Sequence, residues 1–323
     1  MMIGVLTNVH SRQNKKGRYN RYVLKEALGK GGLIRETESL EEIPRVLEEF
    51  KKKKVQVIGV NGGDGTLSAA LTLLFRYYPK SEPLPKILHM RGGTMNLASN
   101  NIEMYGTPLI VARRLRQKLN EVHHDFAQLE TTSFWTLKIM ASFLQHPLYG
   151  FCFGNGIIYK VIQQFYQMGG GSPAKGLRLL STIIGGSMLQ LQDTLALWEK
   201  TPGAVIVEGQ TLPMKEHLFL LASTYSQLVL GFAPFIHGDR NTDDFNFIAF
   251  NVGPGETMRN LPTWMRGIGV ADQLPRDDLF NDRVREVLME TRGGFTIDGE
   301  TWASEKPYEL RLALGRQVSF IKL

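Results

Sequence analysis

A glycine-rich turn with a single carboxylate lies between a strand-like run and a helix-like run of the chain. Residues 59–66 read Gly-Val-Asn-Gly-Gly-Asp-Gly-Thr, after the apolar run 55–58 and before a helix expected over 67–78. Glycines let backbone N–H groups approach an anion closely, and the first turn of a helix points free N–H groups at it. We therefore expect a phosphate or nucleotide site here, with contacts from Gly62, Gly63, Gly65 and Thr66.

Asp64 is the unusual residue of this turn, because a carboxylate repels a bare phosphate. Its presence indicates either a phosphate-bound metal ion or a proton acceptor for an attacking hydroxyl. The turn matches neither Gly-x-x-x-x-Gly-Lys-Ser/Thr nor Gly-x-Gly-x-x-Gly, the two common nucleotide loops. The alternative reading is a tight turn in which Asp64 and Thr66 only cap the helix.

The first 120 residues alternate between strand-like and helix-like runs, which predicts a parallel sheet with helices on both faces. The expected strands are 3–6, 33–37, 55–60 and 86–90, and the expected helices are 19–28, 39–50, 67–78 and 106–119. Ser39 and Glu42 have the spacing of a capping box at the start of the second helix.

A second glycine turn, Arg-Gly-Gly-Thr-Met-Asn at 91–96, follows the fourth expected strand and opens another helix. Ligands of parallel sheets bind beyond the carboxyl ends of the strands. Residues that directly follow strands are therefore expected to converge on one edge: Asn8, Thr37, Asp64 and Thr94.

Beyond residue 122 the pattern changes to short strand candidates with turns between them, which predicts an antiparallel β-sandwich. The candidates are 122–130, 135–142, 204–207, 218–223, 245–252, 285–290, 295–298 and 309–314, with helices over 157–168 and 175–197. A last strand, 318–321, is expected to return to the first domain. We thus expect an α/β domain over 1–122 with 316–323, and a β-sandwich domain over 123–315.

The composition indicates a soluble globular protein with an anionic partner. The chain has 323 residues, a net charge of +7 and one cysteine, Cys152, which excludes an intramolecular disulfide and suits a reducing cytoplasm. No signal peptide and no run of 18 apolar residues is visible, so we expect a cytoplasmic protein. The charge favours nucleotide phosphates or an acidic membrane leaflet. Nucleic acid is not expected, because no motif of aromatic and basic residues supports it.

Three motifs in this order resemble the diacylglycerol kinase catalytic-domain family, which includes bacterial lipid kinases and sphingosine and ceramide kinases. They are Gly-Gly-Asp-Gly-Thr at 62–66, Gly-Gly-Thr-Met-Asn at 92–96 and Asp-Gly-Glu at 298–300. NAD kinases and phosphofructokinases are more distant relatives of that family. The resemblance implies a Rossmann-like nucleotide-binding α/β domain, a C-terminal β-sandwich domain that binds lipid, and an active site in the cleft between them.

The resemblance also implies roles for individual residues. Asn8 and Ser11 match the family's first nucleotide loop, where Val9 and Arg12 replace its proline and glycine. Thr37 lies where relatives have a nucleotide-contacting threonine. The second turn carries the Gly-Thr-x-Asn motif, which assigns nucleotide contacts to Gly93, Thr94 and Asn96.

Two late acidic segments complete the expected site. Glu300 matches a glutamate proposed as the general base; without the resemblance, Asp298-Gly299 reads as a two-residue hairpin turn with Glu300 on the return strand. Asp243 and Asp244 resemble a strand start where some bacterial members bind a structural magnesium, with a solvated loop as the alternative. His123 and His124 are not expected to bind metal, because adjacent residues of a strand point to opposite faces.

We therefore expect an ATP- and Mg²⁺-dependent lipid kinase with peripheral contact with a membrane. Glu300 is the expected base, and Asp64 is the rival base and the expected magnesium ligand. Whether it forms a homo-oligomer is left open. A first alternative is an NAD kinase-like phosphotransferase, although the adjacent Asn-Glu pair of those enzymes is not found. A second is a non-catalytic nucleotide- or lipid-binding module, because the first loop is degenerate and Leu97 replaces a family aspartate.

Overall fold

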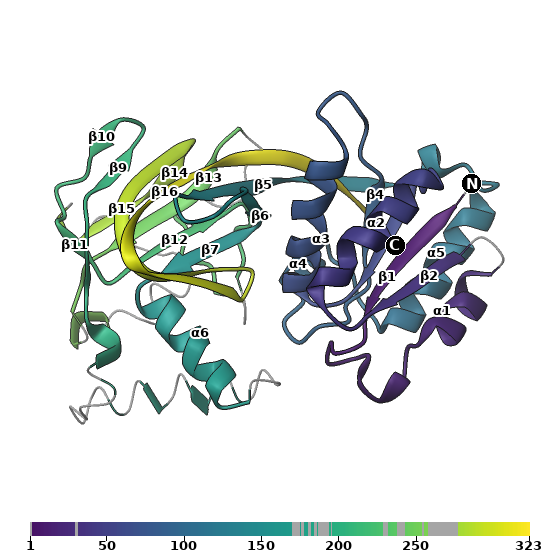
Figure 1. Cartoon of the computed structure of the whole chain (residues 1–323), viewed down its shortest axis with the longest axis horizontal. Coiled ribbons are helices and arrows are strands. Elements are labelled where there is room, and N and C mark those ends of the chain that lie inside the picture. Colours follow the sequence, from purple (N-terminus) through teal and green to yellow (C-terminus); the bar gives the residue numbers. More distant parts are fainter. Residues whose placement is uncertain are drawn as a thin grey trace. The chain divides into compact units, whose positions relative to one another are not determined.

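The computed structural model describes two compact units of the chain (Figure 1). Its described residues are 2–29, 32–169, 175, 178–179, 182–183, 186, 194, 196–228, 232–237, 243–253, 255–257 and 277–323. Unit 1 comprises 1–135 and 316–323, and unit 2 comprises 136–315. Two strands, β5 (Thr131–Ala141) and β16 (Glu300–Ile321), contribute residues to both units.

Unit 1 is built on a parallel sheet of strands in the order β2-β1-β3-β4. The strands are β1 (Ile3–Asn8), β2 (Gly32–Thr37), β3 (Val57–Asn61) and β4 (Lys86–His89). The end of β16 joins beside β4, with Phe320 opposite Ile87 in parallel register. The parallel α/β fold expected for the N-terminal part is therefore confirmed, and the last strand does return to this sheet.

Helices cover the two faces of this sheet in pairs (Figure 1). They are α1 (Arg21–Leu28), α2 (Ile43–Lys52), α3 (Asp64–Tyr77), α4 (Leu97–Asn101) and α5 (Pro108–Glu121). Helix α1 contacts α5, and α2 contacts α3. Each apolar stripe faces the sheet, as in α2, where Ile43, Val46, Leu47 and Phe50 are buried. Short 3₁₀ turns lie at η1 (Lys15–Gly17), η2 (Leu40–Glu42) and η3 (Phe126–Gln128).

Two local predictions for this unit are wrong. Ser39 and Glu42 form no capping box: the Ser39 side chain caps no N–H, and Glu42 instead accepts the backbone N–H of Glu38 at 2.8 Å. The 3₁₀ turn η2 precedes the α-helix, which begins only at Ile43 with Pro44 in its first turn. No strand forms over 122–130, because α5 extends to Glu121 and the chain then turns.

That turn explains the two adjacent histidines. His123 and His124 have φ angles of 49° and 63°, in the left-handed region, so they terminate the helix rather than alternate along a strand. Asp125 then caps η3 by accepting the N–H of Ala127 at 3.0 Å. The helix expected over 67–78 also begins earlier than predicted, at Asp64.

Unit 2 is mainly antiparallel, as expected. Its strands are the last part of β5, β6 (Leu148–Gly150), β7 (Cys152–Asn155), β8 (Thr201–Pro202), β9 (Val205–Val207), β10 (Gln210–Thr211), β11 (Glu216–His217), β12 (Phe219–Ser223), β13 (Phe245–Phe250), β14 (Leu279–Val284), β15 (Glu286–Ile297) and most of β16. The described helices are α6 (Ile157–Gln167) and the 3₁₀ turn η4 (Ala196–Trp198). The helix expected over 175–197 lies largely outside the described residues.

Two long strands connect the layers of this unit. β15 pairs with β7 at its Phe295–Ile297 end and with β9 at its Val287–Met289 end, and a register shift between Thr291 and Gly293 separates the two halves. Such a bulge bends the strand that carries it. The sequence pattern predicts four separate strands here: 285–290, 295–298, 309–314 and 318–321. In the structure the first two belong to β15 and the last two to β16, and each strand is continuous between them.

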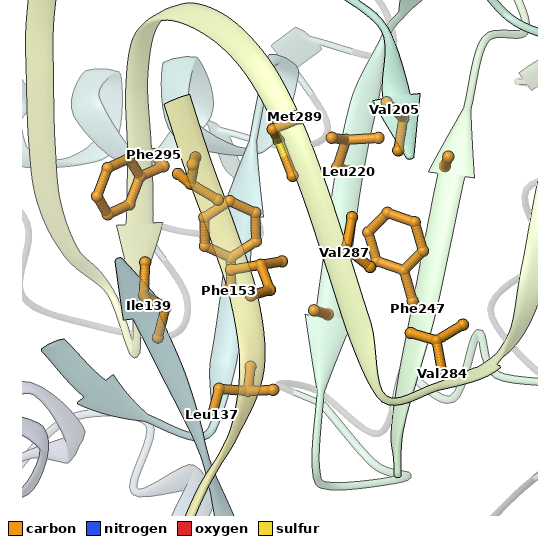
Figure 2. Close-up of a cluster of buried hydrophobic side chains, with 14 of the residues drawn as sticks. Leu137, Ile139, Phe153, Val205, Leu220, Phe247, Val284, Val287, Met289 and Phe295 are labelled. Carbon is orange, nitrogen blue, oxygen red and sulfur yellow. The ribbon is translucent and has the colours of Figure 1, made fainter. Parts of the chain in front are cut away.

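The core of unit 2 lies between these strands (Figure 2). Side chains from β5, β7, β12, β13 and β15 point into it, and Phe153, Phe247 and Phe295 have no exposed surface. Phe295 also stacks on Trp302 across the β15–β16 pair, with ring centroids 5.9 Å apart. In the described parts of the chain, no helix is long and apolar enough to cross a bilayer.

Candidate active site

The two glycine turns of unit 1 pack directly against each other. A Cβ atom on Gly93 would lie 2.3 Å from the Cα of Gly63, and one on Gly92 would lie 2.8 Å from the backbone nitrogen of Gly62. None of these four glycines has a positive φ, so space rather than backbone conformation requires glycine. The sequence analysis assigned Gly62, Gly63 and Gly93 to phosphate or nucleotide binding and missed the contact between the turns.

Asp64 joins the same two turns through its carboxylate. Oδ2 accepts the N–H of Leu97 at 2.9 Å, and Oδ1 accepts the N–H of Ala98 at 3.0 Å. These are the first two residues of α4, whose N–H groups have no partner within the helix. Asp64 therefore caps α4 rather than its own helix α3, and each of its oxygens keeps one lone pair for a further contact.

Asn96 holds the second turn closed. Its φ of 51° and ψ of 48° place it in the left-handed region, which asparagine tolerates better than most residues. Its side-chain Oδ1 accepts the N–H of Gly93 at 3.0 Å, and its Nδ2 donates to the Gly93 carbonyl at 3.2 Å. The amide is buried, so in this structure it shapes the turn.

The first loop contacts the first glycine turn. Asn8 Nδ2 donates to Thr66 Oγ1 at 3.0 Å, and the Asn8 carbonyl accepts the N–H of Ser11 at 3.2 Å. Gln13 donates its N–H to the Gly92 carbonyl at 2.9 Å, which ties this loop to the second turn as well. The expected convergence at the carboxyl ends of the strands is therefore present for Asn8, Asp64 and the second turn.

Thr37 and Thr94 contribute differently. Thr37 is 2% exposed, and its hydroxyl donates to the Thr7 carbonyl at 3.3 Å. Thr94 is half-buried in the second turn, and Gly65 is buried in the first turn of α3. The nucleotide contacts expected of these residues, and of Ser11, stay predictions.

His89 is a buried polar residue of this region that the sequence analysis did not identify. It ends β4, has no exposed surface, and its Nδ1 lies 2.7 Å from the Ser99 hydroxyl of α4. Its Nε2 makes no hydrogen bond of normal geometry among the described residues. Burial lowers the pKa of His89, and this outweighs the opposite effects of Asp64 and the Gly62 carbonyl. The contact with Ser99 links the end of β4 to α4. A histidine at the end of an otherwise apolar strand was the available signal.

In unit 2, Glu300 follows a tight turn between β15 and β16. Asp298 and Gly299 have φ angles of 49° and 90°, and Ile297 pairs with Glu300, as in the two-residue hairpin expected from Asp-Gly. The Asp298 carboxylate accepts the N–H groups of Phe151 at 3.0 Å and Cys152 at 2.9 Å. Tyr166 of α6 donates its hydroxyl to the Gly299 carbonyl at 2.9 Å. The hairpin is thus fixed on two sides.

The Glu300 carboxylate is half-buried on the return strand of this hairpin. Burial raises its pKa above the usual value of 4.5, and no other cause contributes. No described residue forms a hydrogen bond or ion pair with it. A half-buried, unpaired carboxylate on a rigid hairpin is a suitable acceptor for a proton.

Asp243 and Asp244 precede β13. Arg283 Nε donates to Asp244 Oδ1 at 2.6 Å, so the charge of this aspartate is already balanced within the protein. Within the described ranges, no three residues of His, Cys, Asp or Glu gather where they could hold a metal ion. The magnesium expected at this pair stays a prediction.

Comparison with known proteins matches the N-terminal part of the chain to one family. Residues 2–130 match the family model of the diacylglycerol kinase catalytic domain. The chain resembles the diacylglycerol kinase family. The match covers the first loop and the two glycine turns described above. No curated protein sequence matches the chain.

Solved structures extend the likeness to both units. A crystal structure of a candidate diacylglycerol kinase from Bacillus anthracis strain Sterne is 16% identical, with a TM-score of 0.68 over 100% of this chain and 95% of its own. A diacylglycerol kinase structure from the same strain is 15% identical, with a TM-score of 0.63 over 100% and 97% of the two chains. At such identities the likeness shows the fold, and it confirms the expected combination of an α/β part with an antiparallel β part.

Proposed function

We propose that this protein is an ATP- and Mg²⁺-dependent kinase that phosphorylates the hydroxyl of a lipid. The family match supports a kinase, and the observation that carries the lipid-hydroxyl chemistry is the unpaired carboxylate of Glu300 with its raised pKa. Phosphoryl transfer to an alcohol needs a group that positions the hydroxyl and accepts its proton.

The nucleotide part of the proposal rests on the edge of the unit 1 sheet. Backbone N–H groups of 62–66 would contact the phosphates, and Asn8, Thr94 and Asn96 would fix the turns around them. Magnesium fits Asp64, because this ion takes one or two carboxylates together with phosphate oxygens, and each Asp64 oxygen has a lone pair left. When bound, the ion would neutralise negative charge on the phosphates.

Glu300 is the preferred base. Both oxygens of Asp64 already accept backbone N–H groups, whereas the Glu300 carboxylate accepts none from the described residues. Since the acyl chains of a lipid leave little trace in sequence motifs, diacylglycerol, a sphingoid base, ceramide and phosphatidylglycerol are all candidate substrates.

A direct test incubates the protein with labelled ATP, Mg²⁺ and a panel of these four lipids, with NAD in a parallel reaction. The proposal predicts label in one lipid, and none without protein. Label in NAD alone would replace the proposal with an NAD kinase activity.

A second function, non-catalytic nucleotide binding, is favoured by one observation. Asp64 has a structural reason for its identity, and so do four glycines: Gly62, Gly63, Gly92 and Gly93. The presence of these residues alone therefore does not require catalysis. Calorimetric binding of ATP with no transfer to any lipid in the panel would support this second function.

A further inference from the structure

Helices α1 and α5 together carry a concentrated positive charge. They contain six Lys and Arg residues against two Glu residues: Arg21, Lys25, Arg113, Arg114, Arg116 and Lys118 against Glu26 and Glu121. Six against two leaves a net charge of four positive units, more than half of the +7 of the whole chain. The two helices contact each other, so this charge is on one side of unit 1. We call the exposed side chains of α1, α5 and the turn 105–107 the α1–α5 face.

The same face exposes large apolar side chains. Tyr22 is 68% exposed, Tyr105 is 60% exposed and Ile110 is 41% exposed. Tyrosine is enriched at membrane–water interfaces, where its ring meets the acyl boundary and its hydroxyl stays in water. Basic residues together with exposed aromatic and aliphatic groups are typical of surfaces that lie on an anionic bilayer.

A groove between the two helices offers a place for a phosphate group. It has a volume of about 440 Å³ and is lined by Val23, Glu26, Ala27, Arg113, Arg116 and Asn120, among others. Arg116 Nη1 donates weakly to the Glu26 carbonyl at 3.4 Å, and no described residue accepts from the Arg113 guanidinium. A guanidinium with free N–H groups binds phosphate oxygens in a bidentate manner.

The apolar residues lie at the functional edge of unit 1. Helix α1 begins after the loop that follows β1, and α5 begins after the second glycine turn and α4. Tyr22 is the second residue of α1, and Tyr105 lies three residues before α5. Because both helices begin at the carboxyl ends of the strands, these residues are at the same edge as the two glycine turns.

We propose that the α1–α5 face docks the protein on a bilayer of anionic phospholipid. The proposal rests on the proposed function, because a lipid substrate resides in a bilayer. Arg113 and Arg116 would contact headgroup phosphates, while Tyr22 and Ile110 enter the headgroup boundary. The exposed apolar residues favour a bilayer over a nucleic acid, whose phosphate backbone offers them no apolar partner.

Vesicle sedimentation tests the proposal without reference to catalysis. Wild-type protein should bind vesicles of equimolar phosphatidylglycerol and phosphatidylcholine, should not bind phosphatidylcholine vesicles, and should bind less at raised salt. The double variant Arg113→Glu with Arg116→Glu should lose at least about tenfold in partitioning, since each basic residue at an anionic surface contributes measurably to binding. Tyr22→Ser should weaken binding independently.

A matched control variant has the same change of charge on helix α2, outside the α1–α5 face. Arg45→Glu with Lys52→Glu alters two exposed residues of α2, which is paired with α3 rather than with α1 and α5. It should retain wild-type binding. The proposal would be overturned if the wild type did not bind the anionic vesicles, bound phosphatidylcholine vesicles equally well, or bound a DNA duplex in place of vesicles. It would also be overturned if both double variants lost binding equally.

Two further measurements separate membrane binding from folding of the variants and from the kinase reaction. Melting temperatures show whether each variant is folded; if the double reversal does not fold, Arg113→Gln combined with Tyr22→Ser should show the same direction of change. Transfer to the four candidate lipids in detergent micelles reports the kinase reaction alone and should be unchanged in the Arg113 and Arg116 variant. Absence of transfer to all four lipids in wild type would refute the proposed function and leave the vesicle result intact.

Discussion

Asp64 has a structural contact and a proposed chemical role, and a substitution can separate them. Asp64→Asn keeps one oxygen to accept an N–H of α4 but removes the negative charge. Loss of one capping bond should lower the free energy of unfolding by about 1 kcal/mol. Loss of the magnesium ligand should lower kcat far more, by a factor of about 10² or greater. Denaturant unfolding and ATP-dependent transfer measure the two effects; a variant that is destabilised yet fully active would limit Asp64 to the cap.

His217 of β11 makes the stability of unit 2 depend on pH. Its Nε2 accepts from Asn155 Nδ2 at 3.1 Å, its Nδ1 has no partner among the described residues, and burial lowers its pKa to about 4. The unfolded chain binds a proton near pH 6.5 and the folded chain only near pH 4. The contribution is therefore present above pH 6.5 and is lost as the pH falls towards 4, by up to about 3 kcal/mol.

The test is the free energy of unfolding measured between pH 4 and pH 7. The wild type should lose stability over this interval, and His217→Asn, which cannot titrate, should show a smaller slope. Equal slopes in the two proteins would contradict the assignment. His217 lies in a short strand that the sequence pattern does not reveal, so its burial could not be predicted.

The hairpin of β15 and β16 positions Glu300, the residue proposed as the base. Asp298→Ala removes the acceptor of two backbone N–H groups and places alanine at a positive φ, so it should destabilise the protein by about 2–4 kcal/mol. Asp298→Asn keeps an acceptor and tolerates the backbone conformation, so its cost should be smaller. Thermal unfolding of both variants tests this order, and equal melting temperatures for them would show that the carboxylate does not anchor the turn.

Elements with strong local signals could be predicted from the sequence, and the others depended on tertiary contacts. The parallel strands and their glycine turns follow from alternating apolar runs, and the Asp-Gly hairpin follows from its turn residues. The run 122–130 has strand-forming residues, but it directly follows the end of α5 at Glu121, and its two histidines have left-handed backbone angles that make a turn. The continuity of β15 depends on a bulge at Thr291 and Gly293, which reads as a turn when pairing partners are unknown.

The site could be predicted as a set of residues but not as a set of contacts. The order of strands and turns predicted that Asn8, Asp64 and Thr94 lie at one edge of a sheet, and in the structure the loops that carry them contact one another. The sequence did not predict that Asp64 caps α4 or that Gly63 touches Gly93. Both contacts depend on how closely two turns pack that are about thirty residues apart in the chain. His89 was missed for the same reason, because its role arises from Ser99 on another element.

At the scale of the whole molecule, unit 2 depends on a continuous aromatic core. Phe247 of β13 has no exposed surface and packs beside Phe280, with ring centroids 6.0 Å apart. Phe247→Ala should lower the free energy of unfolding by about 3–5 kcal/mol, because it removes a large buried side chain and leaves a cavity. Phe143→Ala, at a partly exposed position, should cost clearly less. Denaturant titration of both variants measures the difference, and an equal cost would contradict the assignment of the core.

The central claim is that Glu300 accepts the proton of a lipid hydroxyl. The most direct measurement compares Glu300→Gln with Glu305→Gln, an exposed glutamate of the same strand, in single-turnover transfer and in ATP binding. We predict that Glu300→Gln lowers the transfer rate about 10²–10⁴-fold and leaves ATP affinity nearly unchanged. In wild type the transfer rate should fall at acidic pH as Glu300 takes up a proton, at a pH above 4.5, and this acidic limb of the pH–rate profile should be absent in Glu300→Gln. Glu305→Gln should behave as wild type. Full turnover by Glu300→Gln, with the acidic limb still present, would contradict the claim.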